Sequence, residues 1–285
     1  MTILVTGANG QLGNEMRIIS AAQEKDEYIF TDVAELDICD ADAVEQMLSE
    51  RHVDVIVNCA AYTNVNGAES NQEICDKINR VAPGILAEAA QKHGCRLLHT
   101  STDYVFDGNH YLPYREDDTP CPTSVYGSTK LEGEKLVQAL CPEAIIIRTA
   151  WLYSTFGNNF VKTMLKLGRE RESLGVVFDQ IGSPTYARDL AAAIDKVLHS
   201  EKWVPGIYHF TDEGVCSWYD FTLAIHQLAG IQCVVNPLHT SEYPTPVRRP
   251  PYSVLDKSKI KETFGVVVPH WYESLRDCIK KLISE

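Results

Sequence analysis

Three glycines near the start of the chain limit the fold more than any other feature of the sequence. Gly7, Gly10 and Gly13 form a GxxGxxG motif between a short apolar run at residues 3–6 and an amphipathic stretch. Glycines at this spacing let a strand turn tightly into a helix, let the backbone approach a pyrophosphate, and let the helix pack closely on the strand. The N–H groups at the start of that helix then face the phosphates. A glycine-rich turn without a ligand is the alternative, but the position between strand and helix favours dinucleotide binding.

An acidic residue follows the second apolar run. Residues 28–31 predict a strand that ends at Asp32, which is 19 residues past Gly13. At that spacing a carboxylate reaches the hydroxyls of an adenosine ribose and disfavours a 2′-phosphate, so the sequence favours NADH over NADPH. Asp37 and Ile38 stand close behind, where they can add a contact beside the adenine. A solvated turn is the alternative interpretation of these two residues.

Apolar runs and helical stretches alternate through the first half of the chain. Residues 54–61, 96–103 and 144–148 predict buried strands, and the first two end in small or hydroxyl-bearing residues that leave room for a ligand. Such alternation predicts an α/β fold with a doubly wound parallel sheet of the Rossmann type. We therefore expect a dinucleotide-binding domain at residues 1–150. Residues 151–285 are expected to form mainly a smaller, interleaved C-terminal substrate lobe, with some segments returning to the sheet.

Beyond residue 150 the alternation becomes less regular. Helical stretches are expected at residues 218–228 and 271–282, on either side of a proline-rich loop at residues 244–251. This loop carries two adjacent cations, Arg248 and Arg249. A pair of guanidinium groups in a rigid loop favours a clamp for a pyrophosphate, and a solvated surface is the alternative.

Tyr126 and Lys130 are four residues apart in a helical stretch, so both side chains lie on one face and can reach the same ligand. A lysine cation near a tyrosine lowers the pKa of the phenol, which can then pass its proton to a substrate oxygen. Among 13 tyrosines, a lysine at this spacing is expected by chance roughly 0.6 times, so the pair alone is weak evidence. Its meaning comes from the glycine motif and strand ends that precede it.

The charge and cysteine content of the chain exclude several classes of partner. Its 26 basic and 39 acidic side chains give a net charge of −13, which argues against nucleic acid or an anionic membrane as the main partner. The nine cysteines show no CxxC pair and no metal-finger spacing, and reduced thiols are their natural state in a cytoplasm. No run reaches ~18 apolar residues, and no basic segment precedes the apolar start. We therefore expect a cytoplasmic protein that is not exported.

Taken in order, the motifs resemble those of the extended short-chain dehydrogenase/reductase superfamily. More narrowly, the chain resembles the dTDP-4-dehydrorhamnose reductase family nearly from end to end. The stretches that carry this resemblance are residues 10–13, 61–63, 101–108, 125–134 and 248–250. One departure is Asn66, which stands where the family usually has an acid after Val65. An amide can donate as well as accept a hydrogen bond, so the bonding at this position is open.

The resemblance implies hydride transfer from NADH or NADPH to the C4 ketone of dTDP-4-dehydro-L-rhamnose, giving dTDP-L-rhamnose, which commonly goes to polysaccharide. It implies that Tyr126 protonates the nascent alkoxide, that Lys130 holds the nicotinamide ribose, and that Thr102 hydrogen-bonds the same oxygen as Tyr126. Residues implied to contact the substrate are Thr102, Asp103, Tyr104, Trp151, Arg248 and Arg249. Those implied to line the cofactor are Gly7, Gly10, Gln11, Leu12, Gly13, Asp32, Asp37, Ile38, Ala61, Thr63, Thr100, Tyr126 and Lys130.

Each of these roles has a structural alternative. Thr102 can cap a strand end, Asp103 can form a turn, and Trp151 can fill a core. No metal is expected to take part in the chemistry. Some relatives join subunits through carboxylates bound to a magnesium ion, and Glu15 occupies a compatible place. Asp189 is the candidate second carboxylate, but Arg188 beside it would repel a cation.

Two other functions compete with the reductase. A non-catalytic dinucleotide-binding subunit, such as the regulatory subunit of methionine adenosyltransferase, uses the same fold, so fold alone cannot decide. The presence of Thr102, Tyr126 and Lys130 together argues against it. Another nucleotide-sugar reductase or an epimerase of the superfamily is the third hypothesis, and residues 101–108 and 248–250 weigh against it. The oligomeric state, monomer or homodimer, is open.

Overall fold

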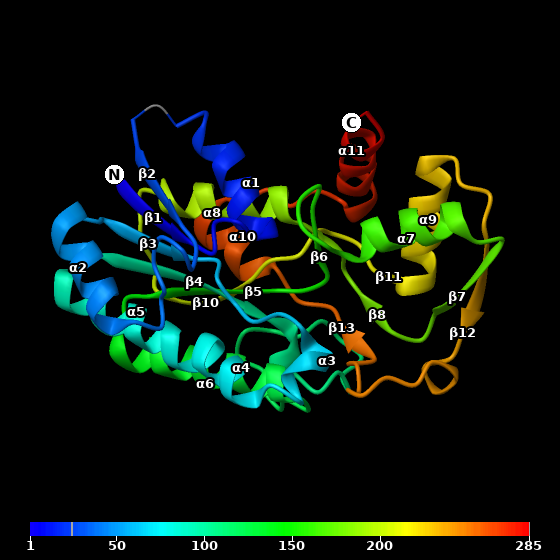
Figure 1. Ribbon diagram of the computed structural model, residues 1–285, viewed down its shortest axis with the longest axis horizontal. Helices are drawn as coiled ribbons and strands as arrows, with labels where there is room; N and C mark the ends of the chain where they lie inside the picture. The colour runs from blue at the N-terminus through cyan, green and yellow to red at the C-terminus, as the bar shows by residue number, and fades with distance from the viewer. Residues whose placement is uncertain (24, 285) are drawn as a thin grey trace.

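A parallel sheet of six strands forms the larger part of the computed structural model, which describes residues 1–23 and 25–284 (Figure 1). In order across the sheet the strands are β10 (Gly206–His209), β5 (Ile145–Thr149), β4 (Arg96–Thr102), β3 (Val55–Asn58), β1 (Thr2–Thr6) and β2 (Glu27–Thr31), all parallel to their neighbours. The chain runs outward from β1 to β2 and then places β3 on the other side of β1. This reversal creates a switch point, where parallel sheets open a crevice at their carboxyl ends.

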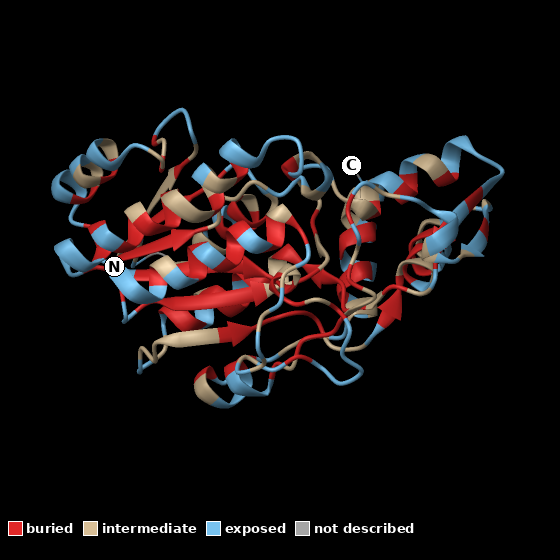
Figure 2. Ribbon diagram, turned by 90° about the horizontal axis from the view of Figure 1, so that it is seen from below, coloured by how far each residue is buried: buried red, intermediate tan, exposed pale blue. Residues whose placement is uncertain are grey.

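Alternation along the strands divides the apolar side chains between two cores. Ile3 and Val5 of β1 belong to one core, and Leu4 between them belongs to the other. Helices α1 (Gln11–Ser20), α8 (Ala187–Leu198) and α10 (Ser258–Phe264) cover the first face, and α2 (Ala41–Arg51), α5 (Ala82–His93) and α6 (Val125–Leu140) cover the second. The central strands of the sheet are buried, the edge strand β2 is mostly half-buried, and the outer helix faces are exposed (Figure 2). The expected doubly wound Rossmann-type sheet is confirmed.

Four shorter helical segments connect these elements. They are α3 (Val65–Ala68), α4 (Gln72–Asp76) and the π-helix η1 (Lys77–Val81), which lead from β3 to α5, and the 3₁₀ turn η2 (Asp103–Val105), which follows β4. No helix within residues 1–23 and 25–284 has the length and apolar character needed to cross a bilayer.

A smaller lobe stands at one end of the sheet, on the right of Figure 1. Its helices α7 (Phe160–Glu170), α9 (Trp218–Ala229) and α11 (Trp271–Ser284) pack around a third apolar cluster. Its strands are β6 (Leu152–Tyr153) with β9 (Thr185–Tyr186), β7 (Ser173–Val177) with β12 (Val234–Leu238), and β8 (Ile181–Gly182) with β11 (Cys216–Ser217) and β13 (Tyr252–Ser253), and the short turn η3 (Thr240–Glu242) follows β12. Because β10, α8 and α10 return to the large sheet, the two parts are interleaved. The boundary at residue 150 stays a prediction.

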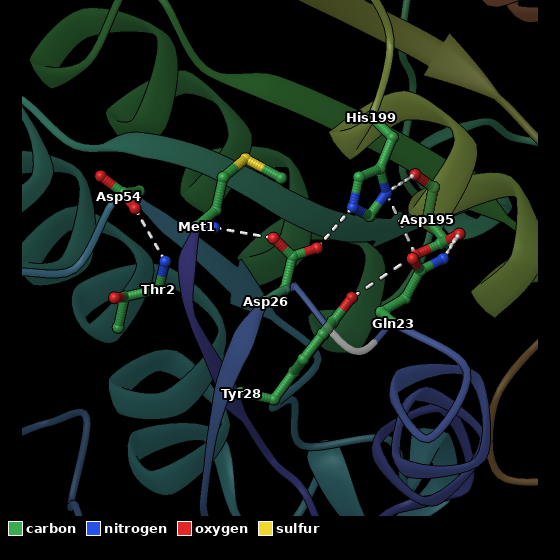
Figure 3. Close-up of polar contacts among 8 residues, drawn as sticks. All are labelled: Met1, Thr2, Gln23, Asp26, Tyr28, Asp54, Asp195 and His199. Atoms are coloured by element: carbon green, nitrogen blue, oxygen red, sulfur yellow. Dashed lines mark hydrogen bonds and ion pairs between the residues drawn. The ribbon is translucent and has the colours of Figure 1, made fainter.

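Polar contacts join the C-terminal part of α8 to the amino ends of β1 and β2, at the end of the sheet opposite the crevice (Figure 3). Asp26, just before β2, lies 2.7 Å from the ammonium group of Met1 and 2.6 Å from Nε2 of His199. Tyr28 of β2 donates to Asp195 of α8 at 3.4 Å. Burial opposes the charged imidazole, but Asp26 and Asp195 outweigh it and raise the pKa of His199. A helix from the second half of the chain is thus bonded to a strand from the first.

Candidate active site

Three cavities follow one another along the carboxyl ends of the sheet strands. The first has a volume of about 250 Å³, the second about 510 Å³ and the third about 390 Å³. The first and second share Gly10, Cys59 and Ala61 in their walls, and the second and third share Tyr104 and Trp151. The cavities therefore form one groove that runs from the glycine motif into the smaller lobe.

The glycine motif borders the first cavity, and two of its positions have no room for a side chain. Gly7 has a φ of +63°, and a Cβ on it would lie 2.6 Å from the backbone of Ala60 in the neighbouring strand connection. A Cβ on Gly13 would lie 2.4 Å from the carbonyl oxygen of Gly7, so this residue packs α1 against the loop and lines none of the three cavities. The backbone of the loop is left open to a ligand.

The N-terminus of α1 opens onto the groove at the same place. Its N-cap residue is Gly10, which offers no side-chain hydrogen bond, and the first turn contains no acidic residue. The first N–H groups of a helix have no partner inside the helix and carry its positive dipole end. A pyrophosphate satisfies both needs, so this end of the groove fits a dinucleotide.

Asp32 stands where the sequence placed it, in the wall of the first cavity beside Gly7 and Gly10. Its Oδ2 accepts a hydrogen bond from the backbone N–H of Asn9 at 2.9 Å, and its Oδ1 accepts one from Val33 at 2.9 Å. The carboxylate therefore also holds the glycine loop to the end of β2. Asp37 and Ile38 line the same cavity.

Tyr126 and Lys130 on α6 and Thr102 at the end of β4 meet in the second cavity. Thr102 Oγ1 donates to Asp103 Oδ1 at 3.0 Å and accepts from the N–H of Tyr104 at 3.2 Å. Burial raises the pKa of the Tyr126 phenol, with Asp103 acting in the same direction and a hydrogen bond with Thr102 acting against it. The sequence predicts that Lys130 lowers this pKa, but burial dominates and the pKa is raised instead. Tyr126 is therefore a protonated phenol at neutral pH.

Lys130 is almost completely buried, with 2% of the residue exposed. Its Nζ donates to the carbonyl oxygen of Thr100 at 2.7 Å and lies 3.4 Å from Nε2 of His99. Burial lowers the pKa of Lys130 to about 8, although the carboxylate of Glu134 one turn later acts to raise it. The ammonium and amine forms are then both accessible near neutral pH.

Asp103 is a buried carboxyl group beside the phenol. Burial raises its pKa to about 6, against hydrogen bonds from Ser253 and Thr102 that favour the charged form. Among the described residues no group bonds its Oδ2, and the same holds for Oγ of Ser101, two residues earlier in β4. Both residues line the second cavity, so polar atoms without partners face the place where a ligand would sit.

The third cavity lies between the sheet and the smaller lobe and is rich in aromatic rings. Trp151 has a φ of +50°, a left-handed conformation that a tryptophan adopts only when its surroundings hold it there. Its ring stacks on Trp218 of α9 with centroids 3.5 Å apart. Trp151 lines the second and third cavities, so this stack closes the groove on the lobe side.

The structure separates the two arginines that the sequence presented together. Arg249 lines the third cavity and donates to the Tyr104 hydroxyl at 2.8 Å and to Oδ1 of Asn66 at 2.9 Å. Arg248 is exposed, donates to Asn109 at 3.0 Å, and is not part of the described walls. Only Arg249 therefore faces the groove.

Most of the residues implied by the sequence resemblance line this groove. The first cavity takes Gly7, Gly10, Asp32, Asp37, Ile38 and Ala61; the second takes Gly10, Gln11, Leu12, Ala61, Thr63, Thr100, Thr102, Asp103, Tyr104, Tyr126, Lys130 and Trp151; the third takes Tyr104, Trp151 and Arg249. Gly13 and Arg248 stand outside the walls.

Several wall residues were not assigned a role from the sequence. Asn159 follows β6 in the chain and donates to Gln11 Oε1 at 3.0 Å, which joins the glycine loop to the smaller lobe. Phe160, Gln180 and Trp218 line the third cavity. Their segments stood out as polar and aromatic stretches near turn residues, and only the fold shows that they converge.

Glu15 does not face the groove. It is fully buried, its Oε1 accepts from Ser154 at 2.6 Å, and burial raises its pKa. No cluster of three or more His, Cys, Asp or Glu side chains suited to a metal ion occurs in the part of the chain that the structure describes.

Comparison with known proteins places the chain. The family model described as RmlD substrate binding domain matches residues 1–284. A dTDP-4-dehydrorhamnose reductase of Aggregatibacter actinomycetemcomitans is 43% identical, with 96% of this chain and 97% of that protein covered. The chain belongs to the dTDP-4-dehydrorhamnose reductase family.

Two solved structures of the dTDP-4-dehydrorhamnose reductase family share the fold over nearly the whole chain. The protein from Clostridium acetobutylicum is 46% identical, with a TM-score of 0.95 and coverage of 99% of this chain and 100% of that one. The protein from Bacillus anthracis, solved in complex with NADP, is 38% identical, with a TM-score of 0.94 and coverage of 98% and 99%. The family expected from the sequence motifs is thus confirmed.

Proposed function

We propose that this protein reduces the C4 ketone of dTDP-4-dehydro-L-rhamnose to a hydroxyl with a nicotinamide dinucleotide as hydride donor. The observation that carries the proposal is the single groove in which a glycine loop, a Thr102–Tyr126–Lys130 cluster and Arg249 follow one another. A dinucleotide spans the first and second cavities, and a nucleotide-sugar enters from the third. The reacting carbon then lies between the two, in the second cavity.

The dinucleotide end of the groove is supported by the glycine loop, the uncapped N-terminus of α1 and the carboxylate of Asp32. When bound, the cofactor supplies the hydride. We propose that Gly7 and Gly10 hold the pyrophosphate, and that Asp37 and Ile38 stand beside the adenine. Asp32 reads the ribose hydroxyls and favours NADH over NADPH, because a 2′-phosphate placed against its charge is repelled.

The remaining cofactor contacts are proposed around the nicotinamide half of the dinucleotide. They involve Gln11, Leu12, Ala61, Thr63, Thr100 and Lys130, which line the second cavity. We assign the packing role in this set to Gly13, which keeps α1 close to the loop without touching the ligand.

Three side chains of the second cavity handle the proton of the reaction. Tyr126 donates its proton to the alkoxide that forms at C4, for which a protonated phenol with a raised pKa is the right starting state. Thr102 donates a hydrogen bond to the same oxygen, which requires its hydroxyl to turn from Asp103. Lys130 holds the ribose and supplies positive charge beside the phenolate that remains.

The nucleotide-sugar is held by residues that join the sheet to the lobe. Arg249 presents a cation to the diphosphate, positioned by Tyr104 and Asn66. Trp151 and Asp103 border the sugar, since they lie where the second and third cavities meet. Arg248 has a supporting role at most in this proposal, through its bond to Asn109 in the neighbouring loop.

The organisation of the chain supports three further assignments. We propose that residues 1–150 carry dinucleotide binding and that residues 151–285 carry mainly substrate binding. A nucleotide-sugar, and neither nucleic acid nor a membrane, is the proposed partner, in keeping with the net charge of −13. A cytoplasmic location is proposed from nine free thiols, the state that a reducing compartment maintains.

The deciding experiment is oxidation of NADH and NADPH by the purified protein with dTDP-4-dehydro-L-rhamnose and, in parallel, with a UDP-linked 4-keto sugar. Rapid oxidation with the dTDP substrate, faster with NADH than with NADPH, is expected. Tight dinucleotide binding with no oxidation by either ketone would refute the reductase and favour a non-catalytic binding subunit.

A further inference from the structure

A chain of buried polar groups runs beneath the second cavity and ends at Lys130. Thr6 Oγ1 donates to Asn58 Oδ1 at 2.7 Å, Asn58 Nδ2 lies 3.0 Å from His99 Nδ1, and His99 Nε2 lies 3.4 Å from Lys130 Nζ. Asn58 and His99 are fully buried, at 0% exposure, and lie opposite each other on β3 and β4. In a site without solvent each hydrogen bond has a fixed donor and acceptor, and assigning one bond therefore assigns the next along the chain.

The direction begins at a backbone donor. The N–H of Ala60 points at one atom of the Asn58 amide, at 3.1 Å. A backbone N–H only donates, so the atom that faces it must be the amide oxygen, as Oδ1 is. The reversed amide would set two donors against each other. Asn58 Nδ2, which also only donates, therefore faces His99.

His99 must then accept at Nδ1. An imidazole that accepts at one nitrogen is neutral and carries its proton on the other, so His99 is held as the Nε2–H tautomer. Protonation to the imidazolium would place a second N–H against the amide of Asn58. Burial and the neighbouring Lys130 lower the pKa of His99 well below its usual value, in agreement with this direction.

The Nε2–H of His99 points at the amine of Lys130. An ammonium group has donors only, so it leaves this N–H without an acceptor and places two positive ends together. An uncharged amine donates to the Thr100 carbonyl and offers its lone pair to Nε2–H. At 3.4 Å the contact is long, so its effect is mainly electrostatic.

We propose that His99 is a positioning residue that stabilises the uncharged amine of Lys130 and so lets Lys130 act as a proton donor to Tyr126. This inference rests on the reductase proposed above. After Tyr126 has given its proton to the alkoxide, the Lys130 ammonium gives a proton to the phenolate and becomes an amine. That amine accepts the hydrogen bond of His99 and is then reprotonated by one H⁺ from the solution, which is the proton that the overall reduction consumes.

The other titratable groups around Lys130 do not favour its uncharged amine. Glu134, on the same helix, favours the ammonium and is itself held by Arg148 at 2.7 Å. Cys75 also acts to raise the pKa of Lys130. Apart from burial, His99 is thus the neighbour whose orientation favours the amine.

The first test reads the tautomer without any enzyme assay. Nitrogen-15 NMR of the histidine-labelled protein, with His99 assigned by its loss in His99→Gln, is expected to show a neutral Nε2–H imidazole from about pH 5 to pH 9. A protonated ring in that range, or the Nδ1–H tautomer, would overturn the proposal. Because the signal does not depend on turnover, this result stands apart from the fate of the reductase assignment.

The second test reverses the network. In Asn58→Asp the carboxylate can still accept hydrogen bonds from Thr6 and Ala60. It can also accept one from His99, which then carries its proton on Nδ1. Nε2 of His99 becomes an acceptor for the Lys130 ammonium. The basic limb of the pH profile of kcat is expected to move up by about one pH unit, with little change in KM for the dinucleotide. The matched control is Thr6→Val, which removes one bond to Asn58 but leaves Ala60 to orient the amide, so its profile should match the wild type. A basic limb that stays in place in Asn58→Asp, while the tautomer has switched, would show that His99 does not act through Lys130.

Discussion

Tyr126 and Asp103 show how burial prepares single residues for chemistry. Burial raises the pKa of both groups, which keeps the phenol protonated and brings the carboxyl to about 6. A phenol in this state holds its proton until a strong base forms beside it, and an alkoxide is such a base. The acid of the reaction is therefore made by its surroundings, with Lys130 needed mainly after the proton has left.

Tyr126→Phe tests this role. The ring remains, so dinucleotide affinity should be unchanged, whereas loss of the proton donor is expected to lower kcat by about 10²–10⁴-fold. Steady-state kinetics and a fluorescence titration with NADH measure the two quantities. The matched control is Tyr208→Phe, which removes a buried hydroxyl bonded to Val204 away from the groove and should leave kcat intact. Retention of wild-type turnover in Tyr126→Phe would exclude it as the acid.

The two arginines give a second comparison at this scale. Arg249→Gln should raise KM for the nucleotide-sugar by about tenfold or more, because a charge-assisted contact is lost, and leave KM for NADH unchanged. Arg248→Gln, one residue away but directed at Asn109, should change either constant less than twofold. Kinetics with each substrate varied in turn decide the matter. Equal effects of the two substitutions would mean that Arg249 is not the diphosphate contact.

Residue types in the sequence identified most of the groove but not its internal wiring. Thr102, Tyr126 and Lys130 could be found because their spacing and strand-end position have a chemical meaning. His99 has neither ligand spacing nor a partner nearby in sequence, since Asn58 and Lys130 reach it only through the pairing of β3 with β4 and the packing of α6. The sequence does not distinguish Arg248 from Arg249, because a loop has no regular period that would predict which of two neighbouring side chains points into the groove.

Among the elements, the sequence predicts those with long apolar runs and does not predict the short strands or those late in the chain. The five predicted strands and helices α9 and α11 match the structure within a few residues. Strand β10 has only four residues, and within it only Ile207 and Tyr208 are apolar, so its apolar run is too short to be recognised. Helix α8 is strongly amphipathic, but the sequence does not identify which of the segments after residue 150 return to the sheet. The buried Leu190 and Ile194 of α8 cover the same face as α1.

Contact between α1 and the glycine loop gives a prediction for a whole element. Gly13→Ala places a Cβ 2.4 Å from the Gly7 oxygen, which forces the helix away from the loop. Overpacking of this kind costs about 1–3 kcal/mol, and the shifted helix end should also weaken NADH binding. Thermal unfolding with and without NADH measures both effects. The control is Gly94→Ala, at a helix end with a φ of +67° and open space around it, which should lose stability and keep NADH affinity. Unchanged affinity in Gly13→Ala would separate this glycine from cofactor binding.

The stability of the whole molecule should carry the cost of Asp103. Its pKa is 3.8 in the reference state and about 6 when folded, so the folded chain binds more protons between these values and becomes less stable as pH rises from about 4 to 6. Asp103→Asn removes this penalty. It should raise the free energy of unfolding by on the order of 1–3 kcal/mol at pH 7, with the gain gone below pH 4, and should impair turnover. Urea unfolding at several pH values measures the gain.

Asp107→Asn is the control of opposite sign for that experiment. Hydrogen bonds led by the N–H of Asn109 lower the pKa of Asp107, so its charge stabilises the folded chain above the reference pKa and its loss should destabilise at pH 7. If both substitutions lower the free energy of unfolding at pH 7, the buried Asp103 carboxylate does not destabilise the folded chain. The prediction that Asp103 supports turnover at the expense of stability is then wrong.

Interleaving of the two parts predicts how the chain unfolds. Residues 1–150 contain the glycine motif and the catalytic cluster, yet they lack β10, α8 and α10, which cover one face and one edge of the sheet. A fragment of residues 1–150 would expose Ile145 and Ile147 and lose the bonds that Asp195 and His199 make with Tyr28 and Asp26 (Figure 3). We therefore expect the full chain to unfold in one urea transition and the fragment to show no cooperative transition and no NADH affinity. A fragment that binds NADH as tightly as the full chain would establish residues 1–150 as an independent domain, in which case the returning segments stabilise the sheet without being needed to form it.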